Sequence, residues 1–321
     1  MKNVIAILSL TLLATACTKS PVIEFENQGN PLIRHIYTAD PSARVFDDKL
    51  YLYTSHDRDD TDNKAHFDMT DWHVFSTTNL TDWVDHGAFF SLDDISWGSK
   101  QAWAPDAVQR NGKYYFYYPV EQAKIGVAVS DSPTSGFVDP LGNPLIDKTD
   151  NEQVVGREPI DPAILIDDNG QAYMYFGCRD ARVVKLKDNM IELDGNIVPV
   201  QINGIDKFNE KSGGGWYGEG PWVFKRGKYY YYMYSNGWEK DTTLVYAMAT
   251  NPLGPFDYVG EVMTPVGAGT SHGSITQFKD KWYVFYHSRV LSNQSKQRSV
   301  HLDQISFDNN GKIVPLVYIA P

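Results

Sequence analysis

Cysteine is scarce in this sequence, since its 321 residues contain only Cys17 and Cys178. Because Cys17 lies in a processing motif described below, no intramolecular disulfide is expected. Positive charge is also in short supply, with 29 Lys and Arg against 40 Asp and Glu and a formal net charge of −11. This balance argues against a nucleic-acid partner, which would need a basic surface. The composition suits a globular protein that acts on a neutral ligand.

The first apolar run is too short for a comfortable transmembrane helix. "MKNVIAILSLTLLATAC" has one Lys, then the apolar run, then small residues before Cys17. This order is typical of a secretory signal, and the stretch 13–17 resembles the lipobox of bacterial lipoproteins. We therefore expect a lipoprotein signal peptide at 1–17, a tether at 18–30 and a protein held at the cell envelope by lipid on Cys17 alone. An ordinary signal peptide that contains a Cys is the alternative.

A long amphipathic helix pattern is also missing, whereas aromatic residues are plentiful. The chain has 20 Tyr, 15 Phe and 8 Trp, a composition that favours strands. One pattern occurs five times: a polar anchor, a short apolar strand, a polar turn and an aromatic strand, as in "IDPAILIDDNGQAYMYFG" and "GEGPWVFKRGKYYYYMYS". Each copy predicts a β-hairpin. Five such units predict an all-β protein with a five-bladed β-propeller over residues 31–321.

The anchors of the five copies are Asp40, Asp106, Asp161, Glu219 and His272. Taken singly, each has a structural explanation: Asp-Pro marks turns, a Glu between glycines can be a solvated loop residue, and a lone His is often a satisfied core residue. In a propeller, however, the start of every innermost strand lies at one mouth of the central channel. Carboxylates gathered there repel one another, so a purely structural site would not collect them. A site that needs an acid and a base together would.

The same segments resemble glycoside hydrolase family 43, five-bladed propeller enzymes that remove arabinofuranosyl or xylosyl units from plant polysaccharides. The matching pieces are "ADPSARVFDDKLYLYTSHD", "WAPDAVQRNGKYYFYY", "EPIDPAILIDDNGQAYMYFG", "YGEGPWVFKRGKYYYYMYS", "SHGS" and "RSVHLDQISFDNNGKI". The resemblance implies that the acid–base triad falls on Asp40, Asp161 and Glu219. It also implies an inverting reaction, in which a base activates water and an acid protonates the departing oxygen.

Within this triad we assign Asp40 as the ionised base and Glu219 as the protonated acid. Aromatic neighbours such as Trp216 would help to keep Glu219 protonated, and Asp161 would raise the pKa of Glu219 and orient it. Trp216 is also a candidate for contact with the sugar.

The resemblance suggests three more site residues. Trp103 is expected to line the sugar pocket by ring stacking, with a core role as the alternative. Arg298 would face the substrate from the last blade, or else be an exposed strand residue. His272 would be the channel histidine beside a structural Ca²⁺ or Na⁺ ion. No cofactor is expected for the chemistry.

The function expected from these residues is an inverting glycoside hydrolase that removes α-L-arabinofuranosyl or β-D-xylosyl units from plant cell-wall polysaccharides or oligosaccharides, as a monomer. Three alternatives stay open: an endo-acting arabinanase or xylanase, a galactofuranosidase, and a propeller that binds glycan without cutting it. A binding module would need aromatic residues but not the three carboxylates together.

Overall fold

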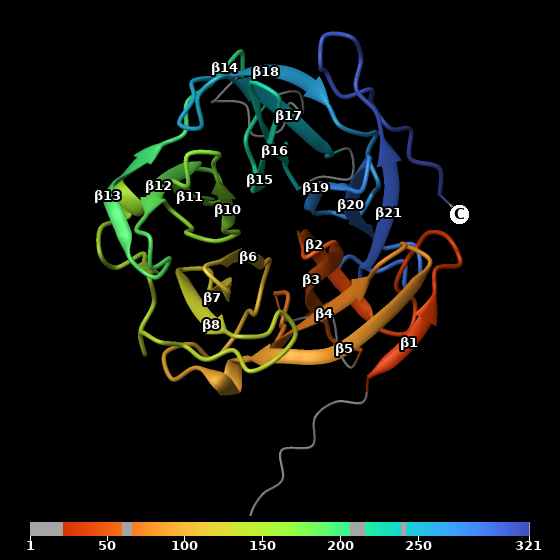
Figure 1. The fold of residues 1–321 in the computed structure, drawn as a ribbon, viewed down its shortest axis with the longest axis horizontal. Helices are drawn as coiled ribbons and strands as arrows, with labels where there is room; N and C mark the ends of the chain where they lie inside the picture. Colours follow the sequence, from red (N-terminus) through yellow and green to blue (C-terminus); the bar gives the residue numbers. More distant parts are fainter. Residues whose placement is uncertain (1–21, 60–65, 206–215, 239–241, 321) are drawn as a thin grey trace, which may run out of the picture.

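Five sheets surround a central axis in the protein (Figure 1). The structure, a computed structural model, describes residues 22–59, 66–205, 216–238 and 242–320. Within these ranges, regular structure other than strand is limited to a 3₁₀ turn, η1 (Leu92–Asp94), and a single helical turn, α1 (Glu152–Val155). The predicted all-β five-bladed propeller is confirmed.

The first two blades follow one another along the chain. Blade one has the order β1-β5-β4-β3-β2, and blade two has the order β6-β7-β8-β9. Their strands are β1 (Ile23–Glu26), β2 (Tyr37–Phe46), β3 (Lys49–Asp57), β4 (Asp71–Thr77), β5 (Asp82–Ser91), β6 (Asp106–Arg110), β7 (Lys113–Val120), β8 (Lys124–Ser130) and β9 (Ile146–Asp147).

Blades three to five complete the ring, with the orders β10-β11-β12-β13, β14-β18-β17-β16-β15 and β19-β20-β21. Their strands are β10 (Ala163–Ile166), β11 (Ala172–Phe176), β12 (Arg182–Leu186), β13 (Leu193–Pro199), β14 (Ile202–Asn203), β15 (Glu219–Arg226), β16 (Tyr229–Ser235), β17 (Leu244–Ala249), β18 (Phe256–Glu261), β19 (Gly273–Phe278), β20 (Lys281–Ser288) and β21 (Ser299–Ile305). The five predicted hairpins are the pairs β2/β3, β6/β7, β10/β11, β15/β16 and β19/β20, each antiparallel.

The ring is closed by the segment before β2 together with the start of β2. Leu32 N donates to Val300 O at 2.8 Å, and Thr38 N donates to Arg298 O at 3.0 Å, so this segment lies along β21 of the last blade. Residues 23–26, which we assigned to the tether, instead form β1 and pair with β5. The part of the expected tether that the structure describes therefore belongs largely to the propeller.

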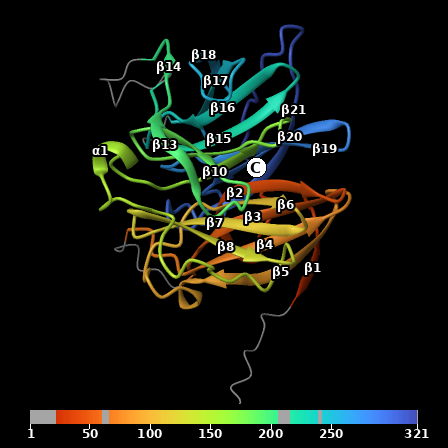
Figure 2. The same cartoon turned by 60° about the vertical axis from the view of Figure 1, so that its left-hand side comes forward.

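Aromatic strands fill the spaces between blades, as β16 illustrates. Tyr232 and Tyr234 pack in a cluster with Tyr175 of blade three, whereas Tyr231 and Met233 pack in a cluster with blade five. Successive side chains of a strand point to opposite faces, so both faces of this sheet are buried. Neighbouring blades therefore pack face against face around the axis, as the turned view in Figure 2 illustrates.

Buried polar groups also join the blades near the channel. The Asp106 carboxylate accepts hydrogen bonds from Ser42 Oγ at 2.6 Å and from Ile164 N at 2.6 Å, and it pairs with Arg44. Asp106 thereby connects blades one, two and three. These bonds satisfy a carboxylate that is 0 % exposed, which a buried charge requires.

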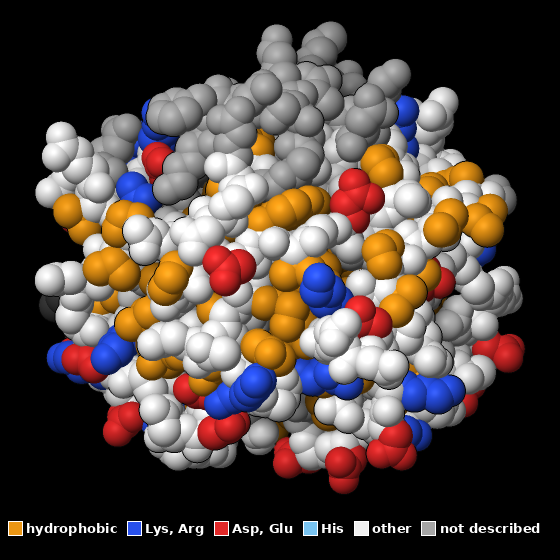
Figure 3. All heavy atoms as spheres, turned by 90° about the horizontal axis from the view of Figure 1, so that it is seen from above, with side chains coloured by type: hydrophobic (Ala, Val, Ile, Leu, Met, Phe, Trp, Pro, Cys, Tyr) orange, Lys and Arg blue, Asp and Glu red, His pale blue; other side chains and the backbone are white. Residues whose placement is uncertain are grey.

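Acidic and basic side chains are interspersed among small apolar areas on the face shown in Figure 3. Across the described residues, no helix combines the length and the apolar character needed to cross a lipid bilayer. The expected signal peptide at 1–17, with Cys17, lies outside the described residues.

Candidate active site

Each of the three predicted carboxylates stands at the start of an inner strand or at a break in it, with a proline directly after Asp40 and Asp161 and two residues after Glu219. Asp40 lies in β2 at an irregularity between Ala39 and Ser42, and Glu219 opens β15 at another between Glu219 and Trp222. Asp161 precedes β10 and, like Asp40, has a positive φ, 56° and 53° respectively. Bulges re-aim side chains and Pro cannot donate to a ladder, so these acids point away from the regular pairing.

A pocket of about 560 Å³ collects most of the predicted site residues. Its lining includes six of them: Asp40, Trp103, Asp161, Glu219, His272 and Arg298. Trp216 is the exception among the described candidates. It lines a smaller neighbouring cavity and packs edge-on against Trp238, which does line the main pocket, with ring centroids 5.2 Å apart. Trp216 therefore supports the pocket wall from behind.

Asp40 is held in its ionised form. Its side chain accepts hydrogen bonds from Ser55 Oγ and from Arg298 Nη1, the latter at 2.9 Å. Burial by itself would raise the pKa of Asp40, but Arg298, followed by His287 and His272, lowers it to about 2. The group is a carboxylate at any pH at which the protein would work, as a general base must be.

Glu219 is placed in the opposite electrostatic state. Burial, followed by repulsion from Asp40, raises the pKa of Glu219 to about 7. A hydrogen bond from the Trp238 side chain acts in the opposite direction and lowers this pKa. Burial thus outweighs the charge repulsion that we expected from Asp161 as the source of the raised pKa. A carboxyl group that keeps its proton near neutral pH can serve as a general acid.

Asp161 is linked to the acid through the backbone. Its Oδ2 accepts a 3.0 Å hydrogen bond from Gly220 N, the residue after Glu219. Burial, then repulsion from Glu219 and Asp40, raises the pKa of Asp161 well above its usual value. The bond fixes the backbone that carries Glu219, so Asp161 positions the acid.

Gly220 is needed for this arrangement. It has a φ of 65°, and a Cβ at this position would lie 3.1 Å from the ring of His272. A larger residue would be strained at this φ, and its Cβ would force the His272 ring to shift by a few tenths of an ångström. Burial lowers the pKa of His272, so its ring is neutral.

Arg298 faces a carboxylate, not open space. Besides Asp40, it binds both oxygens of Asp57, through Nε and Nη2 at 2.8 Å each. The guanidinium is buried between two negative groups, which is how a buried charge is stabilised. It also lines the pocket, so it can meet a substrate while it holds Asp40 in place.

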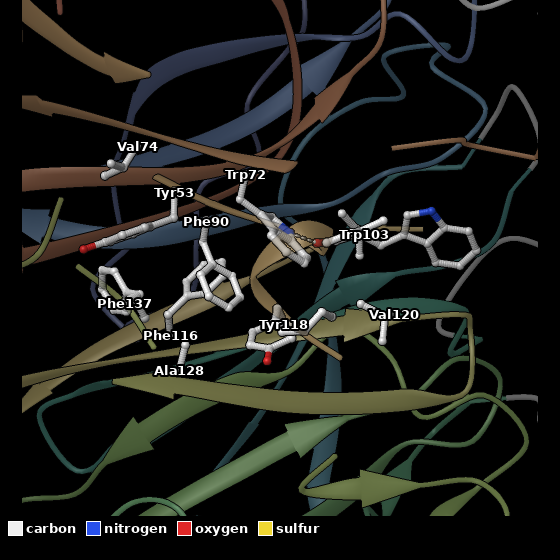
Figure 4. Close-up of a cluster of buried hydrophobic side chains, with 14 of the residues drawn as sticks. Tyr53, Trp72, Val74, Phe90, Trp103, Phe116, Tyr118, Val120, Ala128 and Phe137 are labelled. Atoms are coloured by element: carbon white, nitrogen blue, oxygen red, sulfur yellow. Dashed lines mark hydrogen bonds between the residues drawn. The ribbon is translucent and has the colours of Figure 1, made fainter. Parts of the chain in front are cut away.

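Trp103 has both of the roles that the sequence left open. It belongs to an aromatic cluster between blades one and two, in which Trp72 Nε1 donates to the Trp103 carbonyl at 2.6 Å (Figure 4). Its own Nε1 donates to Phe67 O at 2.9 Å, and the residue lines the pocket. Core packing thereby orients a tryptophan at the pocket wall.

Several residues of the pocket were not predicted. Glu158 accepts a 2.9 Å hydrogen bond from Gln122 and lies 3.8 Å from Arg179 Nε, while the Arg179 guanidinium covers the ring of Trp238 at 4.6 Å. Glu158 stands in the quoted "EPIDP" motif, three residues before Asp161, and that proximity was the available signal. Arg179 and Trp238 lie outside the repeated pattern, so nothing in it marked them.

One pocket thus holds an ionised carboxylate and a protonated one, together with an Asp that positions the acid. This pairing is what an inverting glycoside hydrolase requires, because hydrolysis of a glycosidic bond needs a base for water and an acid for the leaving oxygen. The profile of glycosyl hydrolases family 43 matches residues 28–313. The chain belongs to this family.

Relatives agree with this assignment. The chain is 37 % identical to xylosidase/arabinosidase 43A of Humicola insolens, over 88 % of this chain and 98 % of the relative, and 35 % identical to a xylosidase/arabinosidase of Bacteroides ovatus, over 87 % and 95 %. A family 43 β-xylosidase/α-arabinofuranosidase from a compost metagenome, solved with xylotriose in its calcium-free form, superposes with a TM-score of 0.81. It is 34 % identical, with 92 % of this chain and 100 % of that one covered.

Proposed function

We propose that the protein is an inverting, exo-acting glycosidase that removes α-L-arabinofuranosyl or β-D-xylosyl units from plant cell-wall polysaccharides or oligosaccharides. The observation that carries this proposal is the split in pKa between two carboxyls of one pocket, about 2 for Asp40 and about 7 for Glu219. The relatives' names support the choice of sugars.

In this mechanism Asp40 removes a proton from a water molecule as that water attacks the anomeric carbon. Glu219 gives its proton to the departing glycosidic oxygen. Arg298 keeps Asp40 ionised and oriented, and Asp161 fixes the backbone beside Glu219. Because the water attacks from the face opposite the leaving group, the product has the inverted anomeric configuration.

The test is a screen of aryl-glycosides of arabinofuranose, xylopyranose and galactofuranose, followed by NMR of the first product formed. Hydrolysis of either of the first two with inversion supports the proposal. Hydrolysis of the galactofuranoside alone selects the galactofuranosidase alternative, and a product that retains its configuration overturns the inverting mechanism. Release of oligosaccharides from linear arabinan or xylan would identify endo action, and binding without any hydrolysis would identify a glycan-binding propeller.

We also propose that a cation binds in the channel near His272. The neutral His272 ring offers one nitrogen, and its Nδ1 lies 3.8 Å from Asp40 Oδ1. Among the described residues, His272 is not part of a group of three close His, Cys, Asp or Glu ligand atoms. An ion of the Ca²⁺ type prefers six to eight oxygens, so it would keep water for most of its ligands here. It would add positive charge near the base.

Finally, we propose that the mature chain is a monomer anchored to the cell envelope through lipid on Cys17. The lipobox-like stretch 13–17 supports this localisation.

A further inference from the structure

A cluster of two histidines and an aspartate lies on blade one, outside the pocket described above. His56 is in β3, and Asp71 and His73 are in β4. These strands pair with Ser55 opposite Trp72 and Thr54 opposite His73. The register brings His56 beside Asp71, and His73 lies two residues further along the same face, because side chains alternate along a strand. The three side chains are thus placed by regular backbone.

The spacing of the ligand atoms suits one metal ion. One ligand atom from each residue lies within 4.8 Å of the other two. His73 Nε2 is 3.6 Å from Asp71 Oδ1, and His56 Nδ1 is 2.8 Å from the same oxygen. Two ligands about 2.1 Å from a tetrahedral zinc ion lie about 3.4 Å apart. An ion would fit once the 2.8 Å contact between His56 Nδ1 and Asp71 Oδ1, which is now a hydrogen bond, lengthened.

A second carboxylate stands behind His73, on the side away from Asp71. His73 Nδ1 lies 3.6 Å from Asp85 Oδ1. Asp85 is fixed in turn by His35 Nε2 at 2.8 Å and by Gly87 N at 2.7 Å. Metal-binding histidines commonly give their other ring N–H to a carboxylate, which orients the ring and makes the ligating nitrogen more basic.

Two nitrogens of the cluster have no hydrogen-bond partner among the described residues. These are His56 Nε2 and His73 Nδ1, both buried. Neither nitrogen is a ligand atom in the arrangement above, so the ion itself would not satisfy them, although buried polar atoms normally have a partner. A small shift would let His73 Nδ1 donate to Asp85 Oδ1, which lies 3.6 Å away. The His56 and Asp71 side chains are still 20 % and 22 % exposed, so an ion can reach them from solvent.

We propose that His56, Asp71 and His73 form a binding site for a divalent transition-metal cation of the zinc type, with Asp85 orienting His73 from behind. Two imidazoles and one carboxylate match the ligands that zinc prefers, whereas calcium takes oxygen ligands almost exclusively. The ion would tie β3 to β4 next to Ser55 and Asp57 of β3, which hold Asp40 and Arg298. By fixing β3, the ion would help to hold the general base Asp40 in position from outside the pocket.

The experiment uses the full chain, stripped of metal by a chelator and titrated with Zn²⁺ by calorimetry. We expect one equivalent to bind, and Zn²⁺ to raise the Tm because it binds the folded state. His56→Gln and His73→Gln should each lose this binding, and Asp85→Asn should weaken it by about 10- to 100-fold. Circular dichroism would establish that every variant is folded.

Two histidines outside the cluster provide matched controls. His86→Gln changes a histidine of the same blade that bonds to Ser76, and His272→Gln changes the channel histidine. Both should keep the zinc equivalent. The proposal is overturned if the stripped protein binds no Zn²⁺, if folded His56→Gln and His73→Gln bind it as the parent does, or if His272→Gln alone abolishes binding. Ca²⁺ binding that His73→Gln removes would also contradict it, because the ion class would be wrong.

Discussion

Arg298 Nη1 donates a 2.9 Å hydrogen bond to Asp40 Oδ1, while the same guanidinium holds both oxygens of Asp57. The base of the active site is therefore tied to the last blade of the ring by a buried cation. Asp40 sits in the first blade, so this contact lies where the propeller closes. Ring closure and the ionisation of the base depend on one side chain.

Replacing Arg298 with Met should raise the pKa of Asp40, because Arg298 is the largest of the influences that lower it. The acid limb of the pH profile of kcat/KM should move to higher pH.

Breaking a buried ion pair also costs about 3–5 kcal/mol, so the free energy of unfolding of Arg298→Met should fall. Asp40 with its low pKa stabilises the fold fully above about pH 4, and this contribution is lost as the pH falls through about 2. In Arg298→Met, much of this stabilisation by the ionised Asp40 should disappear.

Arg44→Met provides the control for this prediction. Arg44 also pairs with a buried carboxylate, Asp106, but it is not one of the main groups that set the pKa of Asp40. It should lose comparable stability in denaturant unfolding without a shift of the acid limb. If both variants shift the limb equally, general loosening of the ring is the cause, and the assigned role of Arg298 is wrong.

The alkaline limb should report Glu219. With a pKa of about 7, its acid form is lost as the pH rises through 7, so kcat/KM should fall about tenfold per pH unit beyond that point. The Trp238 side chain donates a hydrogen bond to Glu219 that favours the ionised form. Trp238→Phe should therefore raise the pKa of Glu219 and move this limb to higher pH. Trp216→Phe, which alters the ring behind Trp238, should leave the limb in place, and a limb that moves equally in both variants would contradict this account.

The repeated hairpin explains what could be predicted from the sequence. Its anchors mark equivalent positions, so the convergence of Asp40, Asp161 and Glu219 followed from the repeat and the ring. Trp216 was misplaced because a strand start does not reveal whether a neighbouring ring faces the pocket or packs behind another ring.

The residues that contact the site residues could not be predicted from the repeated hairpin. Asp57 reaches Arg298 from a position 241 residues earlier in the chain, across the closure of the ring. Arg179 and Trp238 follow β11 and β16, in connections whose sequences differ from blade to blade. Contacts of this kind depend on how blades stack, which no single hairpin sequence specifies.

The lipobox-like stretch that ends at Cys17 gives a prediction about location. Cys17→Ser should abolish labelling by a fatty-acid analogue and move the protein from the membrane fraction to the soluble one. Cys178→Ser is the matched control, since Cys178 is buried in the propeller and should not affect labelling. Continued membrane association of Cys17→Ser would mean that another element anchors the protein.

The last prediction separates the roles of the two carboxyls by the quality of the leaving group. A poor leaving group needs a proton as it departs, whereas dinitrophenolate leaves without one. General acid catalysis contributes about 10²–10⁴-fold, so Glu219→Gln should lose activity by that factor on natural glycans and far less on a dinitrophenyl glycoside. Asp40→Asn should lose activity on both substrates, because the water must be activated whichever group departs. The measurement is kcat/KM of both variants on both substrates, with circular dichroism to establish folding. Equal losses for Glu219→Gln on the two substrates would remove Glu219 from the acid role, and a selective loss for Asp40→Asn on the natural glycan would reverse the two assignments.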